Sequence, residues 1–276
     1  MNFQNPANCK QTLDSKKLYI FDMDGTIYLG YQVFPYAIRF INNLRAAGKK
    51  VLFFTNNASH TTEFYVQKLT KLGFSPTPDE IMTSGDVTKV YLQRHRAGQS
   101  VYLVGTDELV EDFKNDGINI VSGDKEKVDI VITSFDTSMT YKKMDDACRL
   151  VRGGAEYLST HPDFNCPTET GFIPDSGAIA AFVTASTGKK PTYFGKPYRE
   201  TLEMICEATG VSKDDMCLFG DRLYTDIALG ARNGVTSVLV LTGETTADDV
   251  DSAAKDEQPT YVFGSLDDVD KVMFGE

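Results

Sequence analysis

Short apolar runs recur along the chain, and segments with helical periodicity lie between them. Leu18-Tyr19-Ile20-Phe21 and Val51-Leu52-Phe53-Phe54 are two such runs, each as long as a buried strand. Between them, apolar residues recur at helical spacing within residues 35–47. Strands that alternate with helices in this way form a parallel sheet with right-handed crossovers. We therefore predict an α/β fold, an open, doubly wound parallel sheet of the Rossmann type.

The same alternation restarts near Ser84 and resumes its first rhythm after Gly188. The further elements that the pattern predicts are helices over 61–72, 107–115 and 141–151, strands over 101–104, 128–133, 157–159, 192–194, 216–219 and 235–241, and helices after Pro197 and Thr225. The simplest arrangement is one discontinuous α/β core, formed by residues 1–83 and 189–276. An inserted α/β domain over residues 84–188 interrupts this core.

The charge of the chain limits the partners it can bind. The 276 residues have a formal net charge of −11, which argues against a nucleic-acid partner, because binding to nucleic acids relies on basic residues. A small anionic substrate would need a locally positive site. No apolar run approaches the roughly 20 residues that span a bilayer, and the polar first residues have no apolar core of a signal peptide. We expect a cytoplasmic protein with no membrane partner.

The cysteines and histidines do not form a recognisable metal site or disulfide framework. The five cysteines are scattered, odd in number and without a C-x-x-C pair, so we expect free thiols in a reducing compartment. His60, His95 and His161 lie in different segments without the spacing of zinc ligands. We expect each histidine to be a surface or loop residue.

Polar side chains follow directly on several of the predicted strands. Asp22 comes after Leu18–Phe21, Thr55 comes after Val51–Phe54, and Asp221 follows a third strand with one glycine between. Ligands of an open α/β sheet bind beyond the carboxyl ends of its strands, so these residues should share one crevice. Lys196, between the 192–194 strand and Pro197, is expected near the same crevice.

These residue types suit one kind of chemistry. Asp22, Asp24, Asp221 and Asp226 supply the hard oxygen ligands that Mg²⁺ prefers. Two carboxylates at i and i+2 after a buried strand also need a cation to offset their repulsion. Carboxylates, a metal, a lysine and a small hydroxyl are the parts needed for phosphoryl transfer through an aspartyl-phosphate.

Each motif taken alone also has a purely structural interpretation. Asp22-Met23-Asp24-Gly25-Thr26 could be an Asx-type turn, and Gly195-Lys196-Pro197 could be a structural loop. Thr55-Asn56-Asn57 could cap a helix or form a turn, and residues 220–226 could be a capped helix start. Their joint order along the chain favours the functional interpretation.

In that order the motifs resemble the signatures of a known family. They are Phe21-Asp22-Met23-Asp24-Gly25-Thr26, Phe54-Thr55-Asn56-Asn57, Gly195-Lys196-Pro197 and Gly220-Asp221-Arg222-Leu223-Tyr224-Thr225-Asp226-Ile227. The chain resembles haloacid dehalogenase (HAD) superfamily phosphatases of the NagD-like, C2-capped (class IIA) type, similar to p-nitrophenyl phosphatases and phosphoglycolate phosphatases. The insert between the second and third signatures marks a C2-type cap, and the loop Thr160-His161-Pro162-Asp163 also resembles this subgroup.

The resemblance implies a role for each signature residue. Asp22 would attack phosphorus, and Asp24 would protonate the leaving group and then activate water. Asp22 and Asp221 would bind Mg²⁺ through their carboxylates, Asp24 would bind it through its backbone carbonyl, and Asp226 would orient the metal shell. The remaining signature residues, Thr55, Asn56, Asn57 and Lys196, would bind the phosphoryl group.

The chain departs from the family pattern at two positions, and other functions are compatible with the same motifs. Asp175 stands where many relatives have glycine, and Tyr224 stands where a small polar residue is common, so both could alter substrate choice. A phosphotransferase or phosphomutase could use the same aspartyl-phosphate, and a catalytically silent binding protein could keep the fold. We predict a Mg²⁺-dependent phosphatase of small phosphorylated metabolites. Family habit also suggests a homodimer formed through the cap.

Overall fold

The computed structural model describes residues 6–168 and 171–275, and the chain divides into two compact units. The first unit comprises Met1–Thr55, Tyr65–Met82 and Ile205–Glu276, and the second comprises Asn56–Phe64 and Thr83–Met204. Contacts thus group residues 56–64 and 189–204 with the second unit. The expected domain boundaries at residues 83 and 188 follow the change in sequence pattern instead, and they stay a prediction.

The first unit is built on a six-stranded sheet with the strand order β14-β13-β12-β1-β4-β5. Its strands are β1 (Leu18–Phe21), β4 (Lys50–Thr55), β5 (Ile81–Thr83), β12 (Met216–Gly220), β13 (Thr236–Val240) and β14 (Tyr261–Phe263). The strand β1 pairs in parallel with both β12 and β4, in registers that align Phe21 with Phe219 and with Phe53. The carboxyl ends of these three central strands therefore lie at one edge of the sheet.

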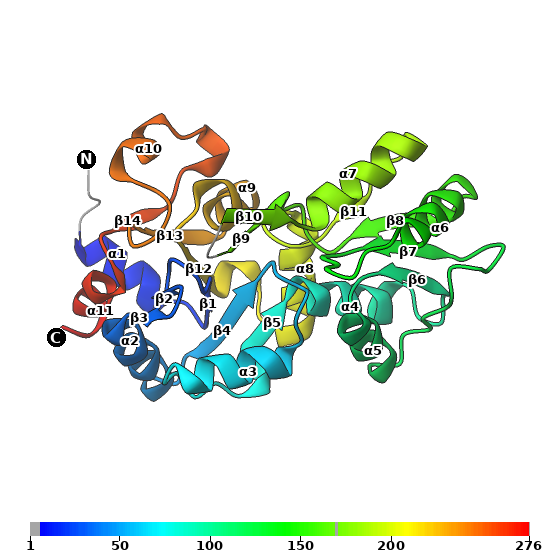
Figure 1. Ribbon diagram of the computed structural model, residues 1–276. Helices are drawn as coiled ribbons and strands as arrows, with labels where there is room; N and C mark the ends of the chain where they lie inside the picture. The colour runs from blue at the N-terminus through cyan, green and yellow to red at the C-terminus, as the bar shows by residue number, and fades with distance from the viewer. Residues whose placement is uncertain (1–5, 169–170, 276) are drawn as a thin grey trace. The chain divides into compact units, whose positions relative to one another are not determined.

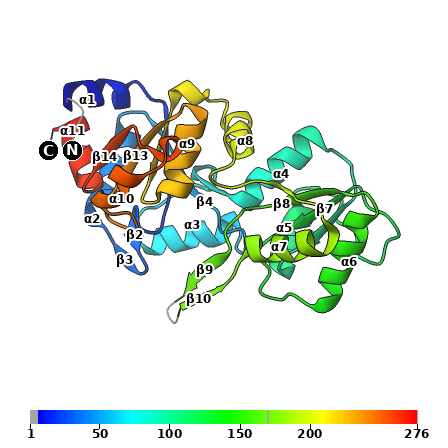
Figure 2. The same cartoon turned by 90° about the horizontal axis from the view of Figure 1, so that it is seen from above.

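Helices cover both faces of this sheet. The other elements of the unit are α1 (Pro6–Asp14), the short strands β2 (Tyr28–Leu29) and β3 (Gln32–Val33), α2 (Pro35–Ala46), η1 (Pro78–Glu80), η2 (Lys213–Asp215), the π-helical η3 (Leu223–Ile227), α9 (Ala228–Asn233), α10 (Ala247–Ser252), η4 (Lys255–Glu257) and α11 (Leu266–Phe274). The helix α3 (Thr62–Lys71) belongs to this unit from Tyr65 onward, and its residues 62–64 belong to the second unit. Figures 1 and 2 show α1 and α11 side by side.

Side chains that alternate along the strands supply the core on each face. Tyr19 and Phe21 belong to the larger cluster, which includes buried residues of α1, α2, α3 and α11. Leu239 of β13 packs on the other face, against Leu223 and Ile227 of η3. All four residues of β1 are buried, which is the burial expected of a central strand covered on both faces.

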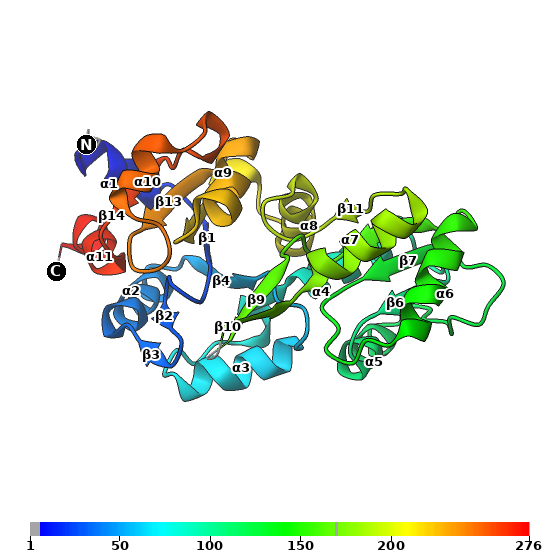
Figure 3. The same ribbon diagram turned by 45° about the horizontal axis from the view of Figure 1, so that its top comes forward.

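The second unit has its own parallel sheet with the order β11-β8-β7-β6. Its elements are α4 (Ser84–His95), β6 (Val101–Val104), α5 (Asp107–Asn115), β7 (Ile130–Thr133), α6 (Tyr141–Arg152), β8 (Glu156–Ser159), β9 (Asn165–Thr168), β10 (Gly171–Pro174), α7 (Ser176–Thr187) and β11 (Thr192–Tyr193), and α8 (Arg199–Thr209) runs across the division between the units. Figure 1 shows α6 and α7 on one face of this sheet and α4 and α5 on the other. The strands β9 and β10 form a separate antiparallel hairpin (Figure 3).

The predicted fold class, an α/β protein with a Rossmann-like parallel sheet and a second α/β unit, is confirmed. The expected strands and helices are present, with ends that differ by one or two residues. The hairpin β9–β10 was not predicted, because its two short strands contain prolines, which disfavour a strand assignment. Within the described residues, no helix has both the length and the apolar composition needed to cross a membrane.

Candidate active site

Three of the predicted site residues lie at the carboxyl ends of the central strands of the first unit. Asp22 follows β1, Thr55 is the last residue of β4, and Asp221 follows β12. The Asp22 N–H donates to the carbonyl oxygen of Phe219 at 2.8 Å, so the sheet ladder fixes the main chain of Asp22. The order β12-β1-β4 makes these three strand ends neighbours, as the sequence predicts.

Three carboxylates of the first unit form a compact cluster. Asp22, Asp221 and Asp226 each offer an oxygen, and these oxygens all lie within 4.8 Å of one another. Asp22 is half-buried, while Asp221 and Asp226 are 2% and 3% exposed. Three carboxylates at this spacing, two of them buried, repel one another unless a cation lies among them. Because all three potential metal ligands are hard carboxylate oxygens, the cluster fits a magnesium ion.

Glycines leave the space that the cluster occupies. At Gly25, which has a φ of +86°, an added Cβ would collide with the Asp221 carboxylate. A Cβ at Gly243 would collide with the same carboxylate, and one at Gly220 would collide with Asp226. The Asp221 carboxylate also accepts the N–H of Glu244 at 2.8 Å. The loop after β13 therefore helps to hold Asp221, although no sequence motif marks that loop.

Arg222 supplies positive charge beside the cluster. Burial by itself would lower the pKa of its guanidinium, but the negative charges of Asp22 and Asp221 raise that pKa above its ordinary value. The Arg222 Nε also lies 3.0 Å from a carboxylate oxygen of Glu244. Arg222 is thus a permanent cation next to two of the predicted metal ligands, a role that sequence reasoning did not assign to it.

Asp24 does not belong to the carboxylate cluster. Its side chain is exposed, and its main chain bridges to Tyr28 in the turn after β1. The Gly25 N–H donates to the Tyr28 carbonyl oxygen at 2.7 Å and closes this turn. The Tyr28 hydroxyl in turn accepts a hydrogen bond from Lys68 Nζ at 2.9 Å. An exposed carboxyl group on a fixed turn is accessible for proton transfer.

The remaining predicted residues form a separate group in the second unit. The Asn56 side chain binds both main-chain polar groups of Lys196: its Nδ2 donates to the Lys196 carbonyl oxygen at 2.9 Å, and its Oδ1 accepts the Lys196 N–H at 2.7 Å. Lys196 is 5% exposed and precedes a cis bond to Pro197. Asn57 folds into a turn, with its Oδ1 accepting from Ser59 N at 2.9 Å and from Ser59 Oγ at 2.7 Å.

The structure thus gathers the predicted residues into two groups. One contains Asp22, Asp221 and Asp226, with Thr55 on the neighbouring strand end, and the other contains Asn56, Asn57 and Lys196. The two groups belong to different units. The expected convergence of Lys196 with Asp22 stays a prediction.

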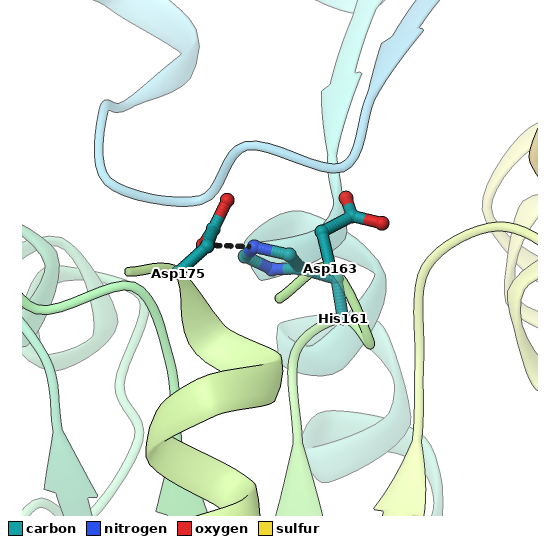
Figure 4. A group of neighbouring side chains, drawn as sticks. All are labelled: His161, Asp163 and Asp175. Carbon is teal, nitrogen blue, oxygen red and sulfur yellow. Dashed lines mark hydrogen bonds and ion pairs between the residues drawn. The ribbon is translucent and has the colours of Figure 1, made fainter. Parts of the chain in front are cut away.

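The structure shows which of the two expected settings applies to His161. His161 lies in the loop after β8, but it is fully buried and not at the surface. Its Nε2 lies 2.8 Å from Asp175, which is 4% exposed and caps α7 (Figure 4). Sequence reasoning named Asp175 as a departure from the family pattern, near the presumed leaving-group pocket, that could alter substrate choice. It did not identify the buried partner, because the two residues are 14 positions apart in irregular segments.

Comparisons with known proteins identify the family to which this chain is similar. A family model described as haloacid dehalogenase-like hydrolase matches residues 19–119, and a second, HAD-hydrolase-like model matches residues 193–269. An acid sugar phosphatase of Staphylococcus haemolyticus is 36% identical over 91% of this chain and 94% of its own length.

Solved structures of similar proteins cover almost the whole chain. A 4-nitrophenylphosphatase from Thermotoga maritima has a TM-score of 0.88 and 39% identity, covering 95% of this chain and 99% of its own. A protein described as NagD has a TM-score of 0.84 and 38% identity, with the same two coverages. These similarities extend across both units.

Proposed function

The chain belongs to the haloacid dehalogenase-like hydrolases and is a NagD-like phosphatase, and from this premise we propose that it hydrolyses small phosphate monoesters with Mg²⁺ through an aspartyl-phosphate on Asp22. The observation that supports this mechanism best is the cluster of Asp22, Asp221 and Asp226 at the carboxyl edge of the parallel sheet. It combines a strand-end carboxylate with two buried carboxylates in a site that fits a cation.

Asp22 is the proposed nucleophile. Its main chain is held by the sheet, so its carboxylate is directed by a rigid element. A carboxylate oxygen forms a bond to phosphorus while the bond from phosphorus to the substrate oxygen breaks. Water then attacks the phosphorus of the aspartyl-phosphate, which releases inorganic phosphate and restores the Asp22 carboxylate.

Asp24 is the proposed acid and base. Its exposed carboxyl group lies outside the cluster, and this placement suits a group that exchanges protons with substrate and water. It gives a proton to the departing alkoxide in the first step. The resulting carboxylate then takes a proton from the attacking water in the second step.

The carboxylates of Asp22 and Asp221 and the backbone carbonyl of Asp24 are the proposed ligands for Mg²⁺. Asp226 shares the cluster, accepts a hydrogen bond from Thr225 Oγ1 at 3.2 Å, and is proposed to orient the metal shell. When bound, Mg²⁺ neutralises negative charge on the phosphoryl group. Arg222 adds its permanent positive charge beside Asp22 and Asp221.

The phosphoryl oxygens are proposed to bind Thr55, the main-chain N–H groups of Asn56 and Asn57, and the Lys196 ammonium. Small hydroxyls, N–H groups and lysine are the donors that stabilise transferring phosphoryl groups. The two hydrogen bonds between the Asn56 side chain and the Lys196 main chain hold the lysine main chain in one conformation. This arrangement supports a role for the two residues as one binding element.

The test of this mechanism is Asp22→Asn, which preserves the shape of the side chain and removes its nucleophilic charge. We expect phosphate release in Mg²⁺ to fall by roughly 10⁴-fold or more while the circular dichroism spectrum stays unchanged. Asp79→Asn, at an exposed aspartate of the same unit, is the matched control and should keep wild-type activity. Retained activity in a folded Asp22→Asn variant would rule out Asp22 as the nucleophile.

Sugar phosphates are the proposed substrate class, because relatives that align along most of the chain are acid sugar phosphatases. A panel of sugar phosphates, nucleoside monophosphates and phosphoglycolate, assayed for phosphate release without an acceptor, tests this proposal. Release only when an organic acceptor is added would favour the phosphotransferase instead.

We also propose the compartment in which the enzyme works. None of the five cysteines, which all lie within the described residues, is in a disulfide bond, and this suits a reducing compartment such as the cytoplasm. The homodimer through the inserted domain stays a prediction from the family resemblance, and sedimentation would test it.

A further inference from the structure

A second cluster of polar side chains lies in the second unit, outside the residues to which the mechanism gives a role. Figure 4 shows His161 facing Asp175 at the start of α7, with Asp163 beside the ring. His161 is fully buried. Burial of polar atoms is costly unless they are hydrogen-bonded, so the contacts of both ring nitrogens determine the state of this residue.

The two hydroxyl groups beside His161 Nδ1 donate their protons to other acceptors. Ser84 Oγ donates to the main-chain carbonyl oxygen of Asn56, which can only accept. Thr160 Oγ1 donates to Ser134 Oγ at 3.0 Å. Because a hydroxyl has one proton, these two oxygens can only accept from His161 Nδ1. Nδ1 lies 2.9 Å from Thr160 Oγ1 and 3.2 Å from Ser84 Oγ, so it is protonated.

The other ring nitrogen faces a carboxylate. His161 Nε2 lies 2.8 Å from Asp175 Oδ1, and the same oxygen accepts the N–H of Ser176 at 2.6 Å. An ionised carboxylate only accepts, so Nε2 is protonated as well. Burial would lower the pKa of His161, but Asp175 and the more distant Asp163 raise it above its ordinary value. These contacts assign His161 as an imidazolium paired with Asp175.

Ser84 connects this imidazolium to the peptide bond between Asn56 and Asn57. A peptide group is planar, so a hydrogen bond that fixes the Asn56 carbonyl also fixes the direction of the Asn57 N–H. The hydroxyl of Ser84, which accepts from a charged ring, is a stronger donor to that carbonyl. Asn56 in turn binds the main chain of Lys196 through its side chain.

We propose that His161 is a positioning residue for phosphoryl binding: through Ser84 it fixes the plane of the Asn56–Asn57 peptide, and through Asn56 it fixes the main chain of Lys196. This inference rests on the proposed function, which gives the Asn57 N–H and Lys196 a phosphoryl group to bind. Asp175 keeps the ring charged and oriented. The position that departs from the family pattern thus acts on phosphoryl binding and not on the leaving group.

The contacts argue against a metal ion in this cluster. The ligand atoms of His161, Asp163 and Asp175 lie within 4.8 Å of one another, as they would in a metal site. A metal-bound imidazole nitrogen must be deprotonated, whereas both nitrogens of His161 donate hydrogen bonds. Asp163 Oδ2 already accepts from Asn56 Nδ2 at 3.0 Å. Protons and amide donors satisfy the group without a cation.

The protonation state can be measured without any activity assay. In a full-length His60→Gln, His95→Gln variant labelled with ¹⁵N-histidine, the only imidazole signals come from His161. At pH 7.5 we expect both ring nitrogens to show bonded protons, and both signals to be unchanged by Zn²⁺. A ring with one proton, or a ring nitrogen that shifts on addition of Zn²⁺, would overturn the assignment.

The positioning role is tested by kinetics of Ser84→Ala, which removes the connecting hydroxyl and leaves the ion pair. We expect kcat/KM to fall about tenfold, the effect of one lost hydrogen bond. The loss should be equal for p-nitrophenyl phosphate and an alkyl phosphate, and inhibition by orthovanadate should weaken by the same factor. Ser122→Ala, at an exposed serine of the same unit, is the control and should match the wild type.

Asp175→Asn provides a second variant if Ser84→Ala does not fold. Asparagine keeps an acceptor for Nε2 and for Ser176 N but removes the charge, so the ring should lose its proton at a lower pH. We expect kcat/KM of this variant to decline at a lower pH than in the wild type, while the exposed Asp145→Asn control keeps the wild-type profile.

The possible failures are distinguishable. Folded Ser84→Ala with unchanged kcat/KM and orthovanadate inhibition would overturn the positioning role. Unequal losses on the two substrates would place the cluster in leaving-group recognition and overturn it too. A wild-type protein that releases no phosphate would overturn the proposed function, and with it the positioning role, while the ring protons would still be measured by NMR.

Discussion

The two units each contain a cluster of three ionisable side chains with ligand atoms within 4.8 Å, yet the clusters differ in chemistry. In the first unit the members are Asp22, Asp221 and Asp226, all of them acceptors. In the second unit His161, to which the contacts assign two donor nitrogens, lies among Asp163 and Asp175. Proximity of ligand-type atoms is the same in both, so it does not by itself identify a metal site.

The difference lies in whether the protein supplies the protons and positive charge that the cluster needs. His161 neutralises Asp175, and Asn56 Nδ2 donates to Asp163. Carboxylates cannot donate to one another when ionised, so the first cluster depends on cations from outside its own members. We therefore expect metal binding at the first cluster to change stability and rate. At the second cluster, we expect protonation of His161 to change them.

Among the variants that compare the two clusters, Asp221→Asn should have the largest effect, because it removes one of the proposed metal ligands. Asparagine keeps an oxygen to accept from Glu244 N, so the fold should persist. We expect phosphate release to fall by about 10³-fold, within the range that transition-state charge stabilisation contributes. Bound Mg²⁺ at about 100 times its Kd should stabilise the wild type by about 2.7 kcal/mol, and this stabilisation should disappear in the variant.

Thermal unfolding with Mg²⁺ and with EDTA measures this effect. The matched variant is Asp175→Asn, which removes an equally buried aspartate of the other cluster and should keep the full Mg²⁺ effect. If Asp175→Asn lost the stabilisation and Asp221→Asn kept it, the assignment of the two clusters would be reversed.

A smaller effect is expected from Gly25→Ala. A Cβ at this position collides with the Asp221 carboxylate, and the φ of +86° disfavours any L-residue. We expect about a 10²-fold fall in kcat, because a displacement of a site group by about 1 Å has an effect of that size. Gly30→Ala is the control, since Gly30 also has a positive φ of +58° but has open space around it. Equal activity losses in the two variants would show that backbone strain alone is responsible.

The sequence predicted the first cluster well and the second poorly, for a physical reason. Asp22 and Asp221 could be placed together because each follows an apolar strand, and parallel strands end at one edge. Asp226 lay within the same signature as Asp221, so its proximity also followed. Regular secondary structure thus converts a position in the sequence into a position in space.

No such regularity applies to the second cluster. His161 and Asp175 flank a hairpin, and Ser84 starts a helix far earlier in the chain. Their contacts depend on how irregular loops pack, which apolar periodicity does not encode. The same holds for Gly243, whose approach to Asp221 comes from an unmarked loop. Asn56 and Lys196 were both predicted, but the hydrogen bonds that join them were not.

The stability of the second cluster should depend on pH. The His161–Asp175 pair raises the folded-state pKa of His161, so its contribution is complete below the ordinary histidine pKa of about 6.5 and is lost as pH rises through the raised value. Asp175→Asn should therefore cost about 3 kcal/mol at pH 6 and much less at pH 9. Urea unfolding at both values measures the cost, with Asp145→Asn as the control. A cost that did not change with pH would mean that His161 is neutral in the folded protein.

The smallest expected effect is that of Tyr28→Phe. This variant tests whether a hydrogen bond between two side chains of the first unit contributes to stability alone or also to the rate. The Tyr28 hydroxyl accepts from Lys68 Nζ at 2.9 Å, and the same ammonium lies 4.5 Å from the ring centroid. Phenylalanine keeps the ring contact and loses one hydrogen bond, so we expect about 1 kcal/mol of destabilisation and a kcat within about twofold of the wild type. Tyr31→Phe, at an 85% exposed tyrosine, should change neither quantity. A tenfold fall in kcat for Tyr28→Phe would instead make the Lys68 contact part of the site, and the first unit would then depend on protein hydrogen bonds as well as on metal.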